Sequence, residues 1–288
     1  MDNFDRTAFC NGKHRRGEWN TRVAAYRGRW LRACAGYVSA KRRGVDRLAA
    51  ALPANSRVLD AGAGTGGYCV WFVNRMPATV VGVDASVEAL RLLKKNREAA
   101  AGRGRILPVC ARLETMPFKS GTFDAIFSID TLGHVGNVAA ALDEFVRLVK
   151  KDGPLFLHSE CADYRSRWPD RRLIEILGRD YCAELDGHTH LLESREIFTL
   201  YLRRFRVISF VNPAGYLGWC LGYPEKYRPA FSRAGLVGAA AFCSVFAAVK
   251  RLPVAGGLLR IVNAITNHVE TYFDLKGGGS CFGSMRRV

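Results

Sequence analysis

Asp60 and the glycines that follow it carry the first chemical signal in this chain. The glycines of this run are Gly62, Gly64, Gly66 and Gly67. Glycine permits positive φ angles and lets a bound ligand approach the backbone closely. An apolar strand before Asp60 and an amphipathic helix over 68–73 would leave free N–H groups at the turn between them. The segment therefore predicts a nucleotide-type ligand site built from a strand, a tight turn and a helix.

Two ligand classes fit this turn. The first, second and fourth glycines have the spacing of a dinucleotide-binding turn, whereas Asp60 and the first three have the spacing of a turn that binds S-adenosylmethionine. A carboxylate here repels a pyrophosphate but attracts the cationic ammonium group of a methionine moiety. Asp60 therefore favours S-adenosylmethionine. A second acid, Asp84, ends the next expected strand, over 79–83, where an acid holds ribose hydroxyls in both classes.

The stretch between positions 110 and 135 distinguishes the two classes. It contains three elements, Arg112–Phe118, Gly121–Ser128 and Leu132–Val135. The first ends in Met-Pro-Phe, the second contains Phe-Asp-Ala-Ile, and the third reads Leu-Gly-His-Val. Together with the glycine turn and Asp84, they resemble the type 11, quinone-biosynthesis-like branch of class I S-adenosylmethionine-dependent methyltransferases. The resemblance covers roughly residues 50–160.

The resemblance implies an α/β fold, with a Rossmann-like, seven-stranded methyltransferase sheet and helices on both of its faces. We expect an N-terminal helical extension before this core and a helical apolar insert before the last strand. The expected division is a basic helical extension over 1–52, a cofactor-binding core over 53–211, an apolar insert or lid over 212–276, and a closing strand over 277–288. The residue patterns predict helices over 87–99, 138–149 and 194–203, and strands over 106–109 and 205–211.

The resemblance also implies the cofactor contacts. They fall on Asp60, Gly62, Gly64, Gly66, Asp84, Ala85, Arg112, Leu113 and Ile129. Asp60 is expected to face the ammonium group and Asp84 the ribose hydroxyls, while the glycines pack against the methionine and ribose portion. Arg112 departs from the family pattern, which places there an aspartate that accepts a hydrogen bond from the adenine amino group. Arginine has no acceptor, so adenine recognition would use backbone groups or guanidinium stacking.

His134 is the expected catalytic base for a hydroxyl acceptor, because it follows the fourth strand at the mouth of the cleft. The other open interpretation is that His134 only holds its loop in place. His158 and Glu160, at the end of the fifth strand, are weaker candidates. No metal site is expected: Asp186–His190 contains His-x-His beside a carboxylate, but no further ligand spacing accompanies it. We interpret it as a loop lining the acceptor pocket.

Charge is distributed unevenly along the 288 residues, whose formal net charge is +17. Residues 1–50 contain 12 basic and 4 acidic side chains and residues 201–288 contain 12 and 3, whereas residues 51–200 contain 19 of each. One interpretation of these basic flanks is a solvated surface, and the other is attraction to an anionic surface. In the second, we expect contacts from Arg15, Arg16, Lys41, Arg42 and Arg43. The nine cysteines show no paired spacing, which predicts reduced thiols and a cytoplasmic location.

The expected insert contains two apolar runs, over 234–249 and 254–262. Neither run reaches the roughly twenty residues that span a bilayer. A lid buried over the substrate and a patch lying in a membrane surface both fit such runs.

An apolar insert, basic flanks and a neutral core favour methyl transfer from S-adenosylmethionine to a lipid, isoprenoid or other apolar acceptor, with peripheral attachment to an anionic membrane. A soluble O- or N-methyltransferase of a sugar or natural product would use the insert only as a lid. An RNA methyltransferase would use the basic flanks for phosphates, but no recognition module is visible and nucleic acid is disfavoured. A binding protein that keeps the cofactor site without an activity is a further alternative.

Overall fold

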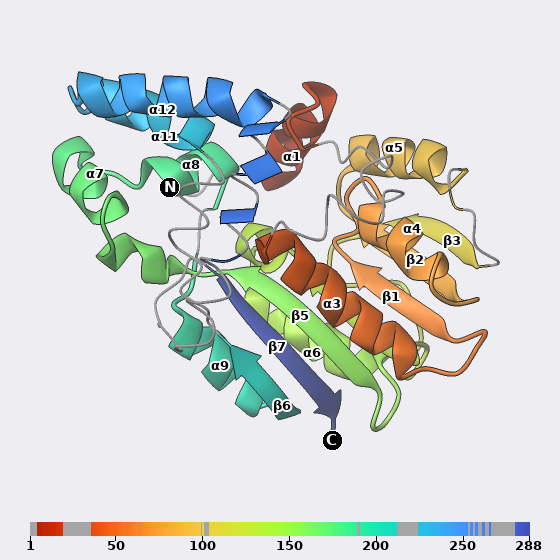
Figure 1. The fold of residues 1–288 in the computed structure, drawn as a ribbon. Helices are drawn as coiled ribbons and strands as arrows, with labels where there is room; N and C mark the ends of the chain where they lie inside the picture. Colours follow the sequence, from red (N-terminus) through yellow and green to blue (C-terminus); the bar gives the residue numbers. More distant parts are fainter. Residues whose placement is uncertain are drawn as a thin grey trace.

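The structure is a computed structural model, and it describes residues 5–19, 36–98, 100, 104–188, 191–211, 224–252, 254–255, 257–258, 261–262, 265 and 280–288. Its centre is one seven-stranded sheet with the strand order β3-β2-β1-β4-β5-β7-β6 (Figure 1). The strands are β1 (Arg57–Ala61), β2 (Thr79–Asp84), β3 (Arg105–Cys110), β4 (Ala125–Ile129), β5 (Pro154–Glu160), β6 (Phe205–Val211) and β7 (Ser280–Arg287). The predicted Rossmann-like methyltransferase fold is confirmed.

Helices cover both faces of the sheet. One face is covered by α3 (Gly36–Ala50), α4 (Gly67–Val73) and α5 (Val87–Arg97), and the other by α6 (Val138–Leu148) and α9 (Ser194–Leu202). Every residue of β4 is buried, as expected for a parallel strand between two helical layers. Side chains alternate along β1, so that Val58 joins the core beneath α4 whereas Leu59 joins the core beneath α6.

The chain closes the sheet with β7, which runs antiparallel between β5 and β6. Its register pairs Glu160 with Ser280 at one end and Pro154 with Arg286 at the other. The closing strand predicted before the C-terminus is therefore present and lies inside the sheet, next to the parallel strand β5.

Helix α3 packs directly on the sheet. A Cβ atom on Gly44 would lie 2.0 Å from Cζ of Phe156, so only glycine allows this close approach of helix and strand. The predicted basic helical extension over 1–52 thus contains a helix that packs on the sheet itself, while positions 20–35 lie outside the described residues. Helix α1 (Arg6–Arg15) lies within the predicted helical extension, although no separate helix was predicted at these residues; Asp5 caps its first turn by accepting a hydrogen bond from the N–H of Ala8 at 2.9 Å.

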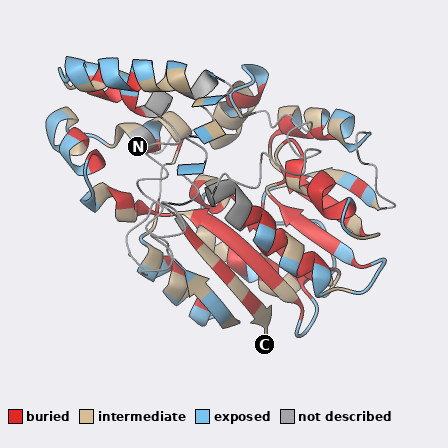
Figure 2. Cartoon of the chain, in the orientation of Figure 1, coloured by how far each residue is buried: buried red, intermediate tan, exposed pale blue. Residues whose placement is uncertain are grey.

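A separate group of helices lies beyond the carboxyl ends of the parallel strands, on the same side as α1 (Figure 1). It comprises α7 (Asp170–Leu177), α8 (Tyr181–Asp186), α11 (Pro224–Arg233) and α12 (Val237–Arg251). These helices share a small core that contains Leu173, Ala183, Tyr227 and Cys243. Figure 2 shows exposed positions along the outer side of α12. Within the described parts of the chain, no helix has the length and apolar character to cross a membrane.

Candidate functional site

The glycine turn joins β1 to α4 at the carboxyl edge of the sheet, and its glycines serve different purposes. Gly62, Gly64 and Gly66 have φ angles of +85°, +51° and +80°. A Cβ on Gly62 would lie 2.1 Å from Oγ1 of Thr131, and one on Gly66 would lie 2.7 Å from Cγ of Leu93. A Cβ on Gly64 would meet no atom within 4 Å. Packing therefore requires the outer two glycines, whereas the middle one borders open space where a ligand can approach the backbone.

Asp60 lies beneath this turn with 2% of its surface exposed. The thiol of Cys69 donates a hydrogen bond to Oδ2 of Asp60 at 3.0 Å. Burial raises the pKa of Asp60 to about 7, the Cys69 hydrogen bond opposes that shift, and nearby Asp84 adds to it. A cationic group bound in the open space would stabilise the ionised form of this carboxyl group.

Asp84 lies at the end of β2, next to the same turn. Its Oδ2 accepts a hydrogen bond from the N–H of Gly64, and its Oδ1 accepts one from the N–H of Ser86, both at 2.8 Å. Burial raises its pKa, although these two backbone N–H groups and His14 oppose the shift. A carboxylate has about four acceptor positions, so Asp84 retains capacity for ribose hydroxyls.

The other predicted cofactor residues border the same edge. Leu113 and Ile129 are buried, each with 6% of its surface exposed, and Ala85 follows Asp84 directly. Arg112 points outward: 63% of its side chain is exposed, and Nη2 lies 3.0 Å from Oε1 of Glu114. Guanidinium stacking on a ligand therefore stays a prediction for Arg112.

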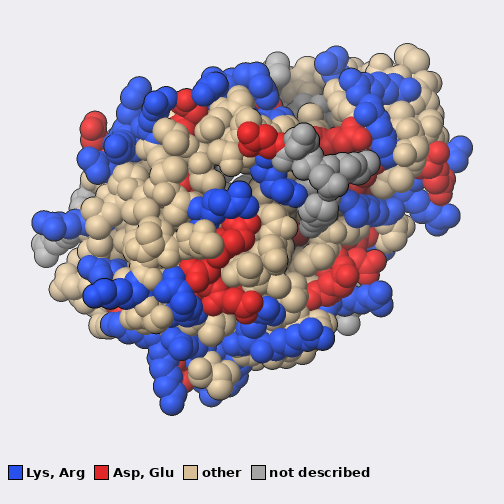
Figure 3. Space-filling model, turned by 180° about the vertical axis from the view of Figure 1, so that it is seen from behind, with Lys and Arg blue, Asp and Glu red and all other residues tan. Residues whose placement is uncertain are grey.

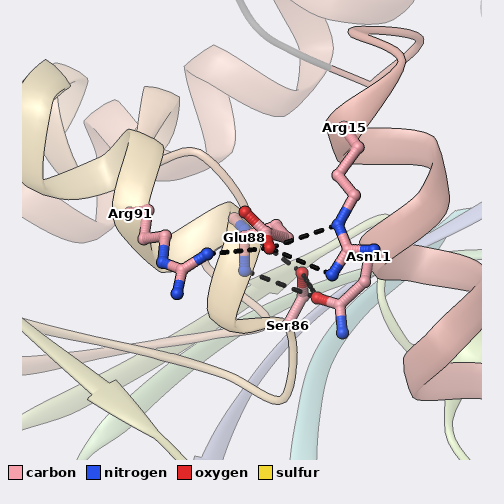
Figure 4. A network of polar contacts seen from close by, with 6 residues as sticks. Asn11, Arg15, Ser86, Glu88 and Arg91 are labelled. Atoms are coloured by element: carbon pink, nitrogen blue, oxygen red, sulfur yellow. Dashed lines mark hydrogen bonds and ion pairs between the residues drawn. The ribbon is translucent and has the colours of Figure 1, made fainter.

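Helix α1 covers Asp84, the acid expected to bind the ribose hydroxyls. The sequence patterns did not identify this helix. Oδ1 of Asn11 accepts hydrogen bonds from the Ser86 hydroxyl at 2.7 Å and from the Glu88 N–H at 3.4 Å (Figure 4). Nη2 of Arg15 lies 3.2 Å from Oε1 of Glu88, which also pairs with Arg91. These contacts fasten α1 to the start of α5. The available sequence signal was Asp5, a helix-capping residue before a short polar helix.

His134 lies in a short 3-10 turn, Leu132–His134, after β4. Its ring centroid is 4.5 Å from that of His188 and 5.1 Å from that of Trp19. The predicted base thus packs against aromatic rings from two distant parts of the chain. A catalytic role for His134 stays a prediction. Among the described residues, no group of three or more His, Cys, Asp or Glu side chains is arranged to hold a metal ion.

The expectation that Lys41 and Arg42 contact a membrane is wrong. They are 4% and 8% exposed, because α3 turns both toward the protein. Lys41 forms an ion pair with Asp130, and the Arg42 guanidinium lies 4.6 Å from the ring centre of Trp71. On the face drawn in Figure 3, groups of basic side chains are interspersed with acidic ones and form no continuous patch.

Comparisons with known proteins agree with this geometry. Residues 59–157 match the family model described as a methyltransferase domain. The chain is 30% identical over 160 residues to a demethylmenaquinone methyltransferase of Roseiflexus castenholzii, covering 52% of this chain and 64% of that protein. It is 27% identical over 129 residues to a phosphoethanolamine N-methyltransferase of Plasmodium falciparum, covering 44% of this chain and 47% of that protein. The chain therefore spans less than two thirds of the length of these relatives.

The fold is also similar to solved structures. Geranyl diphosphate C-methyltransferase from Streptomyces coelicolor A3(2), solved with Mg2+, geranyl diphosphate and S-adenosyl-L-homocysteine, superimposes with a TM-score of 0.55 at 15% identity. The match covers 87% of this chain and 79% of that one.

Proposed function

We propose that this chain, whose residues 59–157 are a class I methyltransferase domain with S-adenosylmethionine as its cofactor, transfers a methyl group to a lipid, isoprenoid or other apolar acceptor. The observation that carries the proposal is the open space at Gly64, whose N–H donates a hydrogen bond to the carboxyl group of Asp84, together with Asp60, which lies close enough to Asp84 for the two carboxyl groups to interact. Two acids and a close-approach glycine suit a ligand with an ammonium group and a ribose.

The residues present fit that cofactor. Asp60 would hold the ammonium group and Asp84 the ribose hydroxyls, while Leu113 and Ile129 offer apolar surface beside them. When bound, the cofactor supplies an activated methyl group on a sulfonium sulfur. The protein then has to orient the acceptor in line with that methyl group, exclude water and accept any proton that the acceptor releases. Helix α1 covers the site, and His134 is the base proposed for the proton.

The apolar acceptor class is supported by helix α12. Ala240 and Cys243 on its inner side are buried against α11 and its neighbours, while Phe242 and Val245 on its outer side are 64% and 63% exposed. The exposed apolar side chains continue after the helix at Leu252, Val254, Leu258, Ile261, Val262 and Ile265. A helix that is apolar on both sides has no face suited to water, and large exposed apolar patches mark binding surfaces.

We therefore propose that α12 contacts a membrane through this outer side. Phe242→Ser combined with Val245→Ser is expected to lower binding to phospholipid vesicles at least tenfold, because each buried apolar side chain contributes about 1.5–3 kcal/mol. Co-sedimentation measures this binding. Leu202→Ser is the matched control, since Leu202 is 55% exposed but lies on α9, at the opposite end of the molecule (Figure 1). A parent protein that stays wholly in the supernatant would favour the alternative below.

A soluble methyltransferase of a sugar or natural product is the second candidate. It is favoured by the packing of α11 against α7, where the hydroxyl of Tyr227 donates a hydrogen bond to buried Asp170 at 2.9 Å. That hydrogen bond joins α11 to α7, and a lid over the substrate would need helices held together in this way beyond the edge of the sheet.

The contacts of α1 predict slow release of the cofactor. Asn11→Ala combined with Arg15→Ala removes the hydrogen bonds and the ion pair that connect α1 to α5. We expect S-adenosylhomocysteine to dissociate about tenfold faster in stopped-flow measurements. Arg91→Ala is the control, because Arg91 pairs with the same Glu88 but lies on α5 itself. Equal dissociation rates in all three proteins would mean that α1 does not gate the site.

The activity itself is tested with cofactor labelled in the methyl group. Incubation with membrane and soluble fractions of a cell extract is expected to label an organic-soluble product, which mass spectrometry then identifies. Label confined to RNA or to water-soluble products would contradict the proposed acceptor class. Asp84→Ala, which is expected to bind the cofactor weakly, is the negative control.

A further inference from the structure

A buried thiol lies beneath the glycine turn, against the first of the two acids. Cys69 is on the inner side of α4 and is fully buried, and its Sγ donates the 3.0 Å hydrogen bond to Oδ2 of Asp60. Asp60 faces α4, because side chains alternate along β1 and Val58, two residues earlier, joins the core beneath that helix. The hydrogen bond therefore joins the helix after the turn to the strand before it.

The space that the thiol occupies depends on Gly82. This glycine lies directly opposite Asp60 in the pairing of β1 with β2. A Cβ atom on Gly82 would lie 3.1 Å from Sγ of Cys69 and 3.0 Å from Cβ of Ala63. A side chain at position 82 would thus press on the thiol. The contact between Cys69 and Asp60 is therefore part of the close packing of β1, β2 and α4.

The Asp60 carboxyl group keeps one oxygen for a ligand. Within the described part of the chain, the bond from Cys69 is the one hydrogen bond that this side chain makes, and it uses Oδ2. Oδ1 therefore retains its acceptor positions. On the other side of β1, Phe127 of β4 pairs with Asp60 and carries no charge. A carboxyl group in such surroundings either keeps its proton or meets a cation.

The titratable groups around Asp60 influence which of these two forms it takes. Cys69 faces it from α4 and Asp84 lies near it on β2. From α1, His14 and Cys10 lie near Asp84. Burial raises the pKa of Asp60 to about 7, the hydrogen bond from Cys69 opposes the shift, and Asp84 adds to it. Burial and the adjacent Asp60 raise the pKa of Cys69 well above its ordinary value, so the thiol remains a donor.

We propose that Cys69 is a positioning residue whose thiol holds the Asp60 carboxyl group where it exchanges its proton for the ammonium group of the methionine moiety, so that cofactor binding releases a proton. This inference rests on the proposed function, in which Asp60 holds that ammonium group. The ammonium group supplies the cation that the buried carboxylate needs, and a hydrogen bond from the thiol favours the same ionised form. The O–H bond of Asp60 breaks, its electron pair stays on the carboxylate oxygen, and the proton leaves to solvent.

The test compares two ligands on the full chain. S-adenosylhomocysteine contains the amino acid portion, whereas 5′-methylthioadenosine has the same nucleoside without the ammonium group. From about pH 6 to about pH 8, the affinity for the first is expected to rise about tenfold relative to the second, because the ionised fraction of Asp60 rises by that factor. Titration of Asp84 or His14 should leave this ratio unchanged, since both groups lie beside the nucleoside that the ligands share.

Calorimetry in two buffers of different ionisation enthalpy counts the protons released on binding. Near pH 6 we expect about one proton more for S-adenosylhomocysteine than for 5′-methylthioadenosine, and near pH 8 almost no difference, because Asp60 is already ionised there. This measurement needs no variant, so it tests the proton release even where a substitution prevents folding.

Three variants assign the proton to this pair of residues. Asp60→Asn should remove the pH dependence of the affinity ratio and the extra proton. Cys69→Val has a side chain of similar size without a donor, and it should move the midpoint of the profile about 0.5–1 unit to higher pH. Cys69→Ser restores a donor and should return the midpoint to the parent's value or below it. Each variant should bind 5′-methylthioadenosine within twofold of the parent, which shows that it is folded.

Two results would overturn the inference: an affinity ratio that does not change with pH in the parent, or one midpoint shared by the parent and a folded Cys69→Val. A parent that binds neither ligand would instead overturn the proposed function.

Discussion

Replacing Asp84 by alanine is expected to weaken binding of S-adenosylmethionine at least tenfold. The Asp84 carboxylate would accept two charge-assisted hydrogen bonds from the ribose, each worth about 1.5–3 kcal/mol. The same side chain accepts from the N–H groups of Gly64 and Ser86, so its loss also frees the turn that faces the ligand. Isothermal titration calorimetry measures the change directly.

Two controls sharpen this result. Asp143→Ala removes an aspartate on α6 whose partner is Arg204 and which lies away from the turn, so cofactor affinity should not change. Asp84→Asn keeps the shape of the side chain and one carbonyl acceptor, and its affinity should fall between those of the parent and Asp84→Ala. An unchanged affinity in Asp84→Ala, or tight binding of NAD by the parent, would contradict the cofactor assignment.

Gly62→Ala and Gly64→Ala are expected to affect different properties: the first lowers stability, and the second lowers cofactor affinity. Both residues have positive φ, which costs an L-residue about 1–2 kcal/mol. The Gly62→Ala methyl group would also collide with Thr131 at 2.1 Å, and the resulting overpacking costs a further 1–3 kcal/mol or so. The Gly64→Ala methyl group meets no protein atom within 4 Å and enters the proposed ligand space.

Thermal and urea unfolding together with calorimetry distinguish the two outcomes. Gly62→Ala should lower the free energy of unfolding by about 2–5 kcal/mol, as the sum of strain and overpacking. Gly64→Ala should stay within about 2 kcal/mol of the parent in stability but lose most of its cofactor affinity. Normal cofactor binding by Gly64→Ala would show that the open space beside Gly64 is not the ligand site.

Local residue patterns identified most of the core. Apolar runs ending in acids located β1 and β2, because a strand buried on both faces has a continuous apolar sequence that differs from the polar turn after it. Ser86 begins α5 as predicted, by accepting a hydrogen bond from the N–H of Ala89 at 3.1 Å. The antiparallel closing strand before the C-terminus was also found, since family resemblance supplied the topology that periodicity alone does not.

Local patterns did not identify α1, because a short polar helix shows no apolar periodicity and its contacts are made with α5, more than seventy positions away in the chain. Local patterns did place His134 at the site. They did not identify the two rings that pack against it, because Trp19 and His188 come from distant segments of the chain.

The sequence by itself determined the glycine turn and the two acids beside it, because each depends on neighbours within a few residues, and its resemblance to a family determined the class of fold. Only the tertiary structure decided which charged residues are functional candidates. Lys41 and Arg43 look equivalent in a basic run, yet Lys41 is buried against Asp130 whereas Arg43 is exposed. The difference arises from which side of α3 meets β5, and Phe156 packing against Gly44 sets that side. Contacts between a helix and a strand more than one hundred residues apart leave no mark in either segment alone.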